Sequence, residues 1–417
     1  MTTYFTSLQS YHTYNYVSIV LDMKVHKNIK LLSWFNFLLD FRFYSPIAII
    51  YFTHVSGSFA LGMAVFSITM LSSALFEVPT GIYSDMLGRK NTLVWGAALS
   101  VLSVLCYAIA GSFVVLAIGG FIEGVARAFY SGNNEAFLLE TLDETGHKEE
   151  YAQYLGTTSS MFQWALAVSA LLGGIIAFYS FPLVMWLSVI PALLGLIVSL
   201  NMTEPKVHKK NVTNIYSHLK EALSFFKKNY RLRTLSISNI ISFAQGEAGY
   251  EFTAAFYNTL WPVWAIGIAK MLSNIGAAIG FHFSGRIIGT FKSLPTLITG
   301  KVYGLISMVL STAYPTVISP VLMSSSSVFF GTGSVAMGSL LQKEYSNKRR
   351  STMGSLNSLF GSIAFAIVAF GLGLFADQVG PAKALLSLQV FAGISLYLLW
   401  RLFRKKEKGL DPSLCSG

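Results

Sequence analysis

The sequence predicts an all-α membrane protein with twelve transmembrane helices in two pseudo-symmetric six-helix bundles. Of its 417 residues, 53% are hydrophobic and only 12% are charged, and the mean hydropathy is +0.56. An average soluble domain is about 25% charged. The apolar residues gather into runs long enough to cross a hydrocarbon core, which takes about 20 residues. A chain with this composition and pattern is expected in a lipid bilayer.

Six apolar runs precede the middle of the chain and six follow it. The first six lie near residues 28–52, 61–83, 91–111, 113–140, 152–178 and 181–201. The other six lie near residues 234–257, 261–284, 293–313, 315–342, 351–376 and 381–402. The expected organisation is a tail over 1–27, a bundle over 28–201, a basic linker over 202–233, a second bundle over 234–403 and a tail over 404–417.

The polar segments at the start and in the middle have separate interpretations. Residues 1–22 contain no Lys or Arg before a short apolar run, so we expect a tail rather than a secretory signal, and Met23 is an alternative start. In the linker, apolar residues recur at helical spacing beside lysines, at Ile215, Leu219, Ala222, Leu223 and Phe226. This pattern predicts an amphipathic helix on the inner membrane surface, which is either a plain linker or a regulatory element.

The net charge of +11 is distributed over alternate loops. One set of loops and both tails collect the basic residues, including Lys24, Lys27, Lys30, Arg89, Lys90, Lys148, Arg286, Lys292, Lys343, Lys348, Arg349, Arg350, Arg401 and Arg404. The other set carries only Lys383. Because cytoplasmic loops are enriched in Lys and Arg, both termini are expected in the cytoplasm, with the protein in the plasma (inner) membrane. Topology therefore explains the charge, and no nucleic-acid partner is expected.

Several chemistries find no support in the sequence. The two cysteines, Cys106 and Cys415, form no disulfide framework and have no metal-ligand spacing, so neither a metal nor another cofactor is expected. The catalytic motifs H-E-x-x-H and G-x-S-x-G do not occur, which disfavours a membrane-embedded enzyme. No Walker motif is present, so ATP is not expected to drive the protein.

The two halves of the chain resemble each other. "YLGTTSSMF" from Tyr154 matches "TMGSLNSLF" from Thr352. The identical pairs lie 198 residues apart and are Gly156 with Gly354, Ser160 with Ser358, Phe162 with Phe360 and Gly173 with Gly371. At nearly the same offset, Gly81 maps onto Gly280. Helices 5 and 11, and the loops after helices 2 and 8, are therefore predicted to be repeat equivalents.

The connection after the second helix carries a recognisable motif. "GIYSDMLGRK", preceded by "FEVPT", resembles the pattern G-x-x-x-D-x-x-G-R-[RK] of the major facilitator superfamily, with Gly81, Asp85, Gly88, Arg89 and Lys90 in their places. The resemblance covers residues 28–403. It implies a transporter in which this loop latches the cytoplasmic side when the protein faces outward.

The resemblance also implies partners for the two central charges of the loop. It places Asp85 near the N-terminus of helix 11 and pairs Arg89 with an acid at the end of helix 4. The acids available there are Glu140, Asp143 and Glu144. Positive-inside charge alone would account for Arg89 but not for Asp85 or the glycines.

The sequence departs from the drug-exporter members of the superfamily in two places. Their fourth helix carries an Arg four residues before a Gly, whereas here Gly124 is preceded at that distance by Gly120. In the loop after helix 8, Ser284 stands near the position of the acid. Both departures favour the superfamily over a particular drug antiporter.

Ionisable residues in the apolar runs are expected to be functional, because each costs several kcal/mol in lipid unless it faces a cavity or a partner. The resemblance implies that helices 1, 4, 7 and 10 line a central cavity. The polar candidates for cavity and coupling are Asp40, Arg42, Glu123, Arg127, Gln245, Glu247, Glu251 and Lys270. Three of the four cavity helices therefore carry charge.

The spacing of the charged residues within helices 1 and 4 indicates which of them can pair inside one helix. Glu123 and Arg127 share one helix face, so they form either a structural ion pair or a functional one. Asp40 and Arg42 point to nearly opposite sides, so they cannot neutralise each other and at least one needs a partner on another helix.

Glu247 and Glu251 on helix 7 also share a face, but as like charges with no cation nearby in the sequence. Such a site is expected to bind a proton or another cation. The serines at 324–327 in helix 10 either line the cavity or bond back to their own helix.

These features predict a secondary active transporter that works by alternating access. Within that class we expect a proton antiporter, similar to the drug:proton antiporters, that exports a small, partly apolar molecule. The alternative is a proton symporter that imports a nutrient or metabolite. The two-fold repeat and the latch disfavour a channel. The expected partners are the small-molecule substrate, protons and the bilayer, and a monomer is expected.

Overall fold

The computed structural model describes residues 27–206, 226, 229–345 and 350–407, and every regular element within these ranges is helical. The order is α2 (Lys27–Asp40), η1 (Ser45–Ile47), α3 (Ala48–Ser56), α4 (Phe59–Leu87), α5 (Arg89–Ala108), α6 (Phe113–Tyr130), α7 (Asn133–Thr145), η2 (Lys148–Glu150), α8 (Tyr151–Tyr179), α9 (Phe181–Leu200), α11 (Tyr230–Tyr257), α12 (Val263–Phe291), α13 (Ser293–Ala313), α14 (Ser319–Ser325), α15 (Ser327–Glu344), α16 (Arg350–Val379) and α17 (Pro381–Glu407). The predicted N-terminal tail, Met23, the amphipathic part of the linker and most of the C-terminal tail lie outside the described residues.

Within the described ranges, ten helical segments are long and apolar enough to cross a membrane, counting α6 with α7 and α14 with α15 as one each. The two remaining predicted spans do not meet that criterion for local reasons. The first span is divided into α2 and α3, of 14 and 9 residues, each shorter than a bilayer crossing. The other is α11, which is 28 residues long but too polar, because Ser, Thr, Asn and Gln residues accompany its two arginines and two glutamates. The predicted all-α membrane fold is confirmed.

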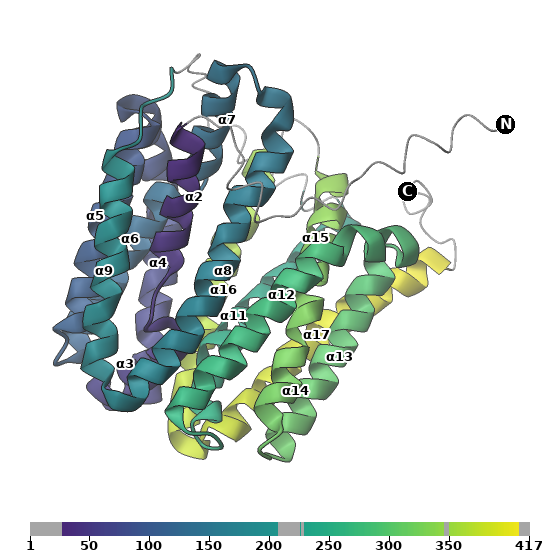
Figure 1. The fold of residues 1–417 in the computed structure, drawn as a ribbon. Helices are drawn as coiled ribbons and strands as arrows, with labels where there is room; N and C mark the ends of the chain where they lie inside the picture. The colour runs from purple at the N-terminus through teal and green to yellow at the C-terminus, as the bar shows by residue number, and fades with distance from the viewer. Residues whose placement is uncertain (1–26, 207–225, 227–228, 346–349, 408–417) are drawn as a thin grey trace, which may run out of the picture.

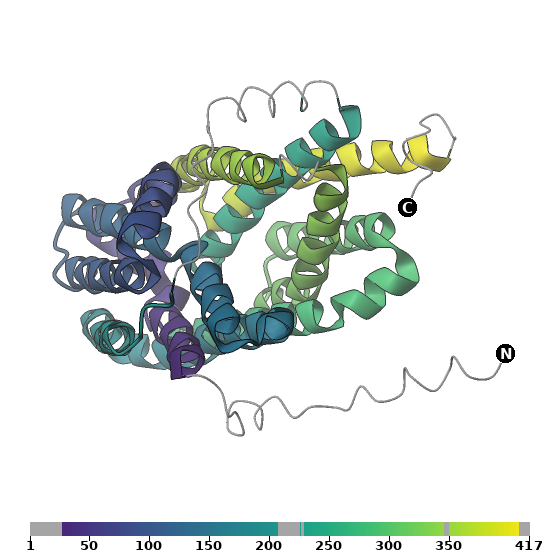
Figure 2. The same cartoon turned by 90° about the horizontal axis from the view of Figure 1, so that it is seen from above.

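The helices form two bundles, α2 to α9 and α11 to α17, which lie side by side (Figures 1 and 2). Two helix pairs make the main contact between the bundles, since α4 packs against α16 and α8 packs against α12. Numbered in the order of the predicted spans, α4 and α16 are helices 2 and 11, and α8 and α12 are helices 5 and 8. A two-fold relation that exchanges helix 5 with helix 11 must also exchange helix 2 with helix 8, so this pairing agrees with the predicted repeat.

The position of the repeat in the loop after helix 8 needs a correction. Gly88 separates α4 from α5 with φ 93° and ψ 161°, and Lys292 separates α12 from α13 with φ 64° and ψ 157°. Lys292 is therefore the counterpart of Gly88, at an offset of 204 residues. The sequence match of Gly81 with Gly280 was wrong, because Gly280 packs against Val328 of α15 inside its own bundle. At the corrected offset of 204 residues, the position that corresponds to Asp85 is Gly289 and not Ser284.

The two bundles touch at one side of the molecule and diverge toward the other. We call the side where α2 begins and α17 ends the basic side, and the far side the opposite side; Figure 1 shows the bundles parting toward the basic side. Near the opposite side, a Cβ added to Gly174 of α8 would lie 2.8 Å from the carbonyl oxygen of Trp264 in the second bundle. Toward the basic side, Gly81, Gly156 and Gly354 on the same interface helices have no neighbour from the described ranges within 4 Å of an added Cβ.

Two predicted spans that contribute to the interface are interrupted. The first breaks between Asp40 and Ser45, just before Pro46, which lacks a backbone N–H and restricts the residue before it. The tenth breaks at Ser326, between α14 and α15. We had expected continuous helices at both places. The breaks matter because they lie beside the cavity described next.

Candidate functional site

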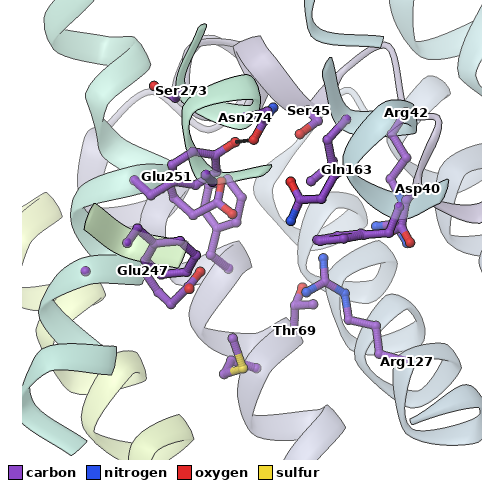
Figure 3. A pocket seen from close by; sticks show the side chains of 18 of the residues that line it. Asp40, Arg42, Ser45, Thr69, Arg127, Gln163, Glu247, Glu251, Ser273 and Asn274 are labelled. Carbon is purple, nitrogen blue, oxygen red and sulfur yellow. Dashed lines mark hydrogen bonds between the residues drawn. The ribbon is translucent and has the colours of Figure 1, made fainter. Parts of the chain in front are cut away.

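A cavity of about 990 Å³ lies between the two bundles, and both bundles line it. It extends from Phe52 and Met308, in the halves of the bundles near the opposite side, to Glu135 and Leu138 of α7, which lies on the basic side (Figure 1). Figure 3 shows part of the lining. Polar lining residues come from the breaks in helices 1 and 10, from α6 and from α11, which are the helices 1, 4, 7 and 10 that the resemblance implied. Others come from α4, α7, α8 and α12, which the resemblance did not name.

The wall of the first bundle holds a charge cluster around Glu123 of α6. Its carboxylate accepts hydrogen bonds from Arg127 Nη2 at 2.7 Å and from the hydroxyl of Tyr107 at 2.8 Å. Arg42, from the break in the first helix, donates to the same carboxylate. The side chain of Glu123 is only 8% exposed, so its ionised form depends on these donors. At least one of Asp40 and Arg42 was expected to have a partner on another helix, and Arg42 is that residue.

The helix break is what brings Arg42 to Glu123. Because α2 ends at Asp40, the guanidinium of Arg42 can turn back and donate through Nε to the carbonyl oxygen of Leu39 at 2.8 Å, one of the last carbonyl groups that α2 leaves without an intrahelical partner. The carboxylate of Asp40 lines the cavity beside this cluster, and it makes no ion pair or hydrogen bond with another of the described residues.

The wall of the second bundle presents the two acids of α11. Glu247 and Glu251 both line the cavity, one helical turn apart, and neither carboxylate makes an ion pair or hydrogen bond within the part of the chain that the structure describes. Figure 3 shows them across the cavity from Arg127 and Asp40. Tyr250 lies between the two glutamates in the sequence, and its hydroxyl donates to Asn274 Oδ1 at 3.2 Å.

Two predicted cavity residues do not line the cavity. Lys270 of α12 is 3% exposed and lies behind Tyr250, with its ammonium 3.8 Å from the centroid of the tyrosine ring and donating to the carbonyl oxygen of the same residue. It is therefore held by a cation–π contact and a hydrogen bond rather than offered to a ligand. Gln245 is also absent from the lining.

The serines of the tenth helix fill both predicted roles, and one of them fills the two together. Ser326 and Ser327 line the cavity at the helix break, and Ser326 also donates to the carbonyl oxygen of Met323 at 2.7 Å. Ser324 instead donates to backbone carbonyl oxygens, those of Pro320 in its own helix and of Ala269 in α12.

The basic-side loop places Arg89 between two acids. Its Nε lies 2.9 Å from Glu140 Oε1, and its Nη1 lies 3.0 Å from Asp85 Oδ1. The predicted pairing of Arg89 with an acid after helix 4 is therefore present, with Glu140 as the partner. Asp85 has a side chain that is 60% exposed, and its ion pair lies within its own loop.

Glu204, just after the first bundle, was missed from the sequence although it organises this loop. Its carboxylate accepts hydrogen bonds from the backbone N–H groups of Arg89 at 2.6 Å and Lys90 at 2.9 Å, and so caps the N-terminus of α5. A Cβ at Gly88 would lie 2.6 Å from that carboxylate, and the residue has φ 93°. Gly88 is needed here for both reasons.

A buried lysine was also missed. The ammonium of Lys301 on α13 donates to Ser242 of α11, which in turn contacts Ser395 of α17 at 2.7 Å between the hydroxyl oxygens. This cluster lies within the second bundle and not among the residues that line the cavity. Among the described residues, no group of three or more His, Cys, Asp or Glu side chains is placed to hold a metal ion.

Two helical bundles with a charged cavity at their interface are the architecture of a secondary transporter. The chain matches the model of the Major Facilitator Superfamily over residues 31–369 and belongs to that superfamily. It is 23% identical over 389 residues to MJ1560 of Methanocaldococcus jannaschii, an uncharacterized MFS-type transporter, with 90% of this chain and 98% of the relative covered.

Solved structures show the same fold. A variant of the nucleoside transporter NupG superimposes with a TM-score of 0.76 at 16% identity, covering 90% of this chain and 98% of the other. A D-xylose-proton symporter superimposes with a TM-score of 0.69 at 13% identity, covering 92% and 96%. The predicted superfamily is confirmed, and the protein is a multi-pass membrane transporter.

Proposed function

We propose that this transporter works by alternating access and exports a small, partly apolar molecule in exchange for protons carried by Glu247 and Glu251. The observation that supports the coupling site is the state of these two carboxylates, which face the cavity without an ion pair or hydrogen bond from the described residues. A carboxyl group free of a fixed cation can exchange a proton when water reaches it. The two acids also share one helix face, so one proton held between them relieves their repulsion.

The rest of the lining supports a ligand of mixed character. Aromatic and thioether side chains line the cavity together with the acids, namely Phe52, Phe66, Met70, Phe162, Tyr257, Met308, Met323, Phe330 and Phe365. Side chains that can hydrogen-bond are at least as numerous, and they come from several helices, among them Gln163 of α8 and Tyr250 and Asn274 of the second bundle. A molecule with an apolar body and several polar groups fits such a lining.

The basic-side loop is proposed as the latch of the outward-facing state, with Gly81, Asp85, Gly88, Arg89 and Lys90 as its residues. Arg89 is already held by Glu140, so the loop is rigidly placed at the end of the first bundle. Asp85 is largely exposed and is free to meet the second bundle when the basic side closes. A carboxylate is favoured at a helix N-terminus, and α16 begins at this side of the molecule.

The basic side is proposed to be cytoplasmic, in the plasma (inner) membrane, with both termini inside and the protein a monomer. The distribution of Lys and Arg carries this assignment. The cavity, whose lining continues to the basic side, then corresponds to an inward-facing state.

The proposal is tested by transport in proteoliposomes with an imposed pH gradient, using a mixed panel of metabolites and drugs. Glu247→Gln or Glu251→Gln should abolish transport driven by the gradient, while exchange of substrate across the membrane can persist. Glu149→Gln, at an exposed acid of the basic side, serves as the matched control and should behave as wild type. If both cavity variants keep wild-type pH-driven transport, proton coupling through α11 is wrong, and Asp40 becomes the better candidate. Uptake rather than release along the proton gradient would identify the importing symporter instead.

A further inference from the structure

The pattern G-x-x-x-D-x-x-G occurs at both ends of the helix pair α4 and α16. It is "GIYSDMLG" in α4, residues 81–88, and "GLFADQVG" in α16, residues 373–380. Asp85 and Asp377 each lie two residues before the end of their helix. The glycine that follows each helix has a positive φ, 93° in one case and 82° in the other. Because the two helices run antiparallel, one pattern lies on the basic side and the other on the opposite side.

Asp377 joins the two bundles in this structure. Its Oδ1 accepts a hydrogen bond from the backbone N–H of Phe59 at 2.7 Å, and its Oδ2 accepts one from Ala60 at 2.9 Å. Phe59 and Ala60 are the first residues of α4, whose N–H groups have no partner within their own helix. A carboxylate of the second bundle therefore caps a helix of the first bundle, where the helix dipole also favours negative charge.

The backbone contact beneath this cap is close. A Cβ at Gly373, one turn before Asp377, would lie 2.6 Å from the carbonyl oxygen of Phe59. Two turns further along α4, the hydroxyl of Ser67 donates to the carbonyl oxygen of Ala366 at 3.0 Å. Near the opposite side, α4 and α16 are therefore in close contact from Ser67 to Asp377.

The other end of the same helix pair differs. An added Cβ at Gly81, the counterpart of Gly373, would meet nothing within 4 Å. Asp85, the counterpart of Asp377, is 60% exposed and pairs with Arg89 of its own bundle. One acid of the pair is engaged across the interface while the other is not.

We infer that Asp377 is a positioning residue for transport that holds the opposite side closed, and that it exchanges this role with Asp85 during the cycle. In the state described here, Asp377 caps α4. When the opposite side opens, that cap is lost, and Asp85 caps α16 at the basic side by the same antiparallel symmetry. The inference rests on the proposed alternating access, but not on the substrate, the direction of transport or the proton site.

The experiment is a distance measurement between spin labels on the opposite side. Labels are placed at Gly111→Cys in the first bundle and Tyr314→Cys in the second, both exposed, in a background without the native cysteines. Double electron–electron resonance is recorded on purified protein in nanodiscs, with no substrate and no pH gradient. The distributions of wild type, Asp377→Asn and Asp377→Ala are compared, with Gln378→Ala as the control in the same helical turn.

Losing one capping side chain shifts an equilibrium by about fivefold. The ratio of the long-distance to the short-distance population should therefore rise about fivefold in Asp377→Ala and stay unchanged in Gln378→Ala. It should rise less in Asp377→Asn, because the amide oxygen still accepts one hydrogen bond while the charge is lost. Combining Asp377→Asn with Asp85→Asn should return the ratio toward that of wild type, because both states then lack their acid. Asp377→Glu, which keeps the carboxylate, should shift the ratio less and provides a folded comparison if the neutral variants express poorly.

Distributions identical to wild type in both neutral variants would overturn the inference, and so would a double variant with a larger shift than Asp377→Asn alone. Loss of pH-driven transport in the α11 variants bears on the proton site and leaves this result unaffected. The two proposals therefore fail separately.

Discussion

Replacing Glu123 by Gln removes the charge that holds two guanidinium groups at the wall of the cavity. The amide keeps the shape of the side chain and one acceptor oxygen, but Arg42 then lies in a place where its side chain is 12% exposed without a carboxylate at contact distance. Removing one partner of a buried ion pair costs about 3 to 5 kcal/mol, because the remaining charge is left uncompensated. Arg127 contributes little to that cost, since its side chain is 41% exposed and stays partly solvated.

We therefore expect Glu123→Gln to lower the free energy of unfolding by about 3 kcal/mol. In a bundle of this size that corresponds to a fall in Tm of roughly 5 to 10 °C. The assay is thermal unfolding of purified protein in one detergent, followed by the fluorescence of a thiol-reactive dye or by tryptophan emission. Arg127→Gln, which removes the more exposed guanidinium, should cost less than about 1 kcal/mol.

The matched control is Glu247→Gln, because it neutralises another acid of the same cavity that has no ion pair. Its Tm should stay at or slightly above the wild-type value, since one of two neighbouring like charges is removed. A Glu123→Gln protein that melts with wild type, or a Glu247→Gln protein that loses as much stability, would refute this reasoning. The first result would assign Glu123 a role in transport rather than in the fold, which decides between the two roles that its spacing to Arg127 leaves open.

Further predictions concern the latch and the orientation. Asp85→Asn should impair transport while leaving expression and substrate binding close to wild type, because it changes the closing of the basic side and not the cavity; full transport activity would contradict it. A cysteine at Ser56 should react with an impermeant maleimide in intact cells, whereas a cysteine at Glu149 should react only after lysis, because the two residues lie on the opposite side and the basic side. The reverse labelling pattern would invert the assigned topology.

The positions of the helices follow from the sequence because burial in lipid is a property of whole segments. The predicted span 293–313 coincides with α13, and most other predicted spans end within a few residues of the observed helices. The interruptions at Arg42 and Ser326 were not predicted, because a span keeps its apolar composition when its helix is broken. Pro46 was the available signal for the first break.

The site was predictable to the extent that charge must be compensated in a membrane. The spacing of Asp40 and Arg42 predicted that at least one of them has a partner on another helix, but not that this residue is Arg42 or that its partner is Glu123, 81 residues away. Glu204 was not predicted, because an acid in a polar segment pays no free-energy penalty for burial in lipid and so is not singled out by its position in the sequence. Lys270 was assigned to the cavity by its charge alone, and only the packing of the tyrosine over its ammonium removes it.

The two walls of the cavity differ in how their charges are compensated, and this difference assigns them different tasks. In the first bundle, Glu123 is bound by two guanidinium groups and a hydroxyl, so its charge is fixed and each exchange would break several hydrogen bonds at once. In the second bundle, Glu247 and Glu251 have no such partners among the described residues, so a proton or a ligand can be gained or lost without breaking a hydrogen bond described here. A ligand or proton can shift the balance between two conformations only if it interacts differently with each of them. The proposed coupling site on α11 meets that condition in principle, because a change of charge there alters the interaction with the fixed charges of the first bundle across the cavity.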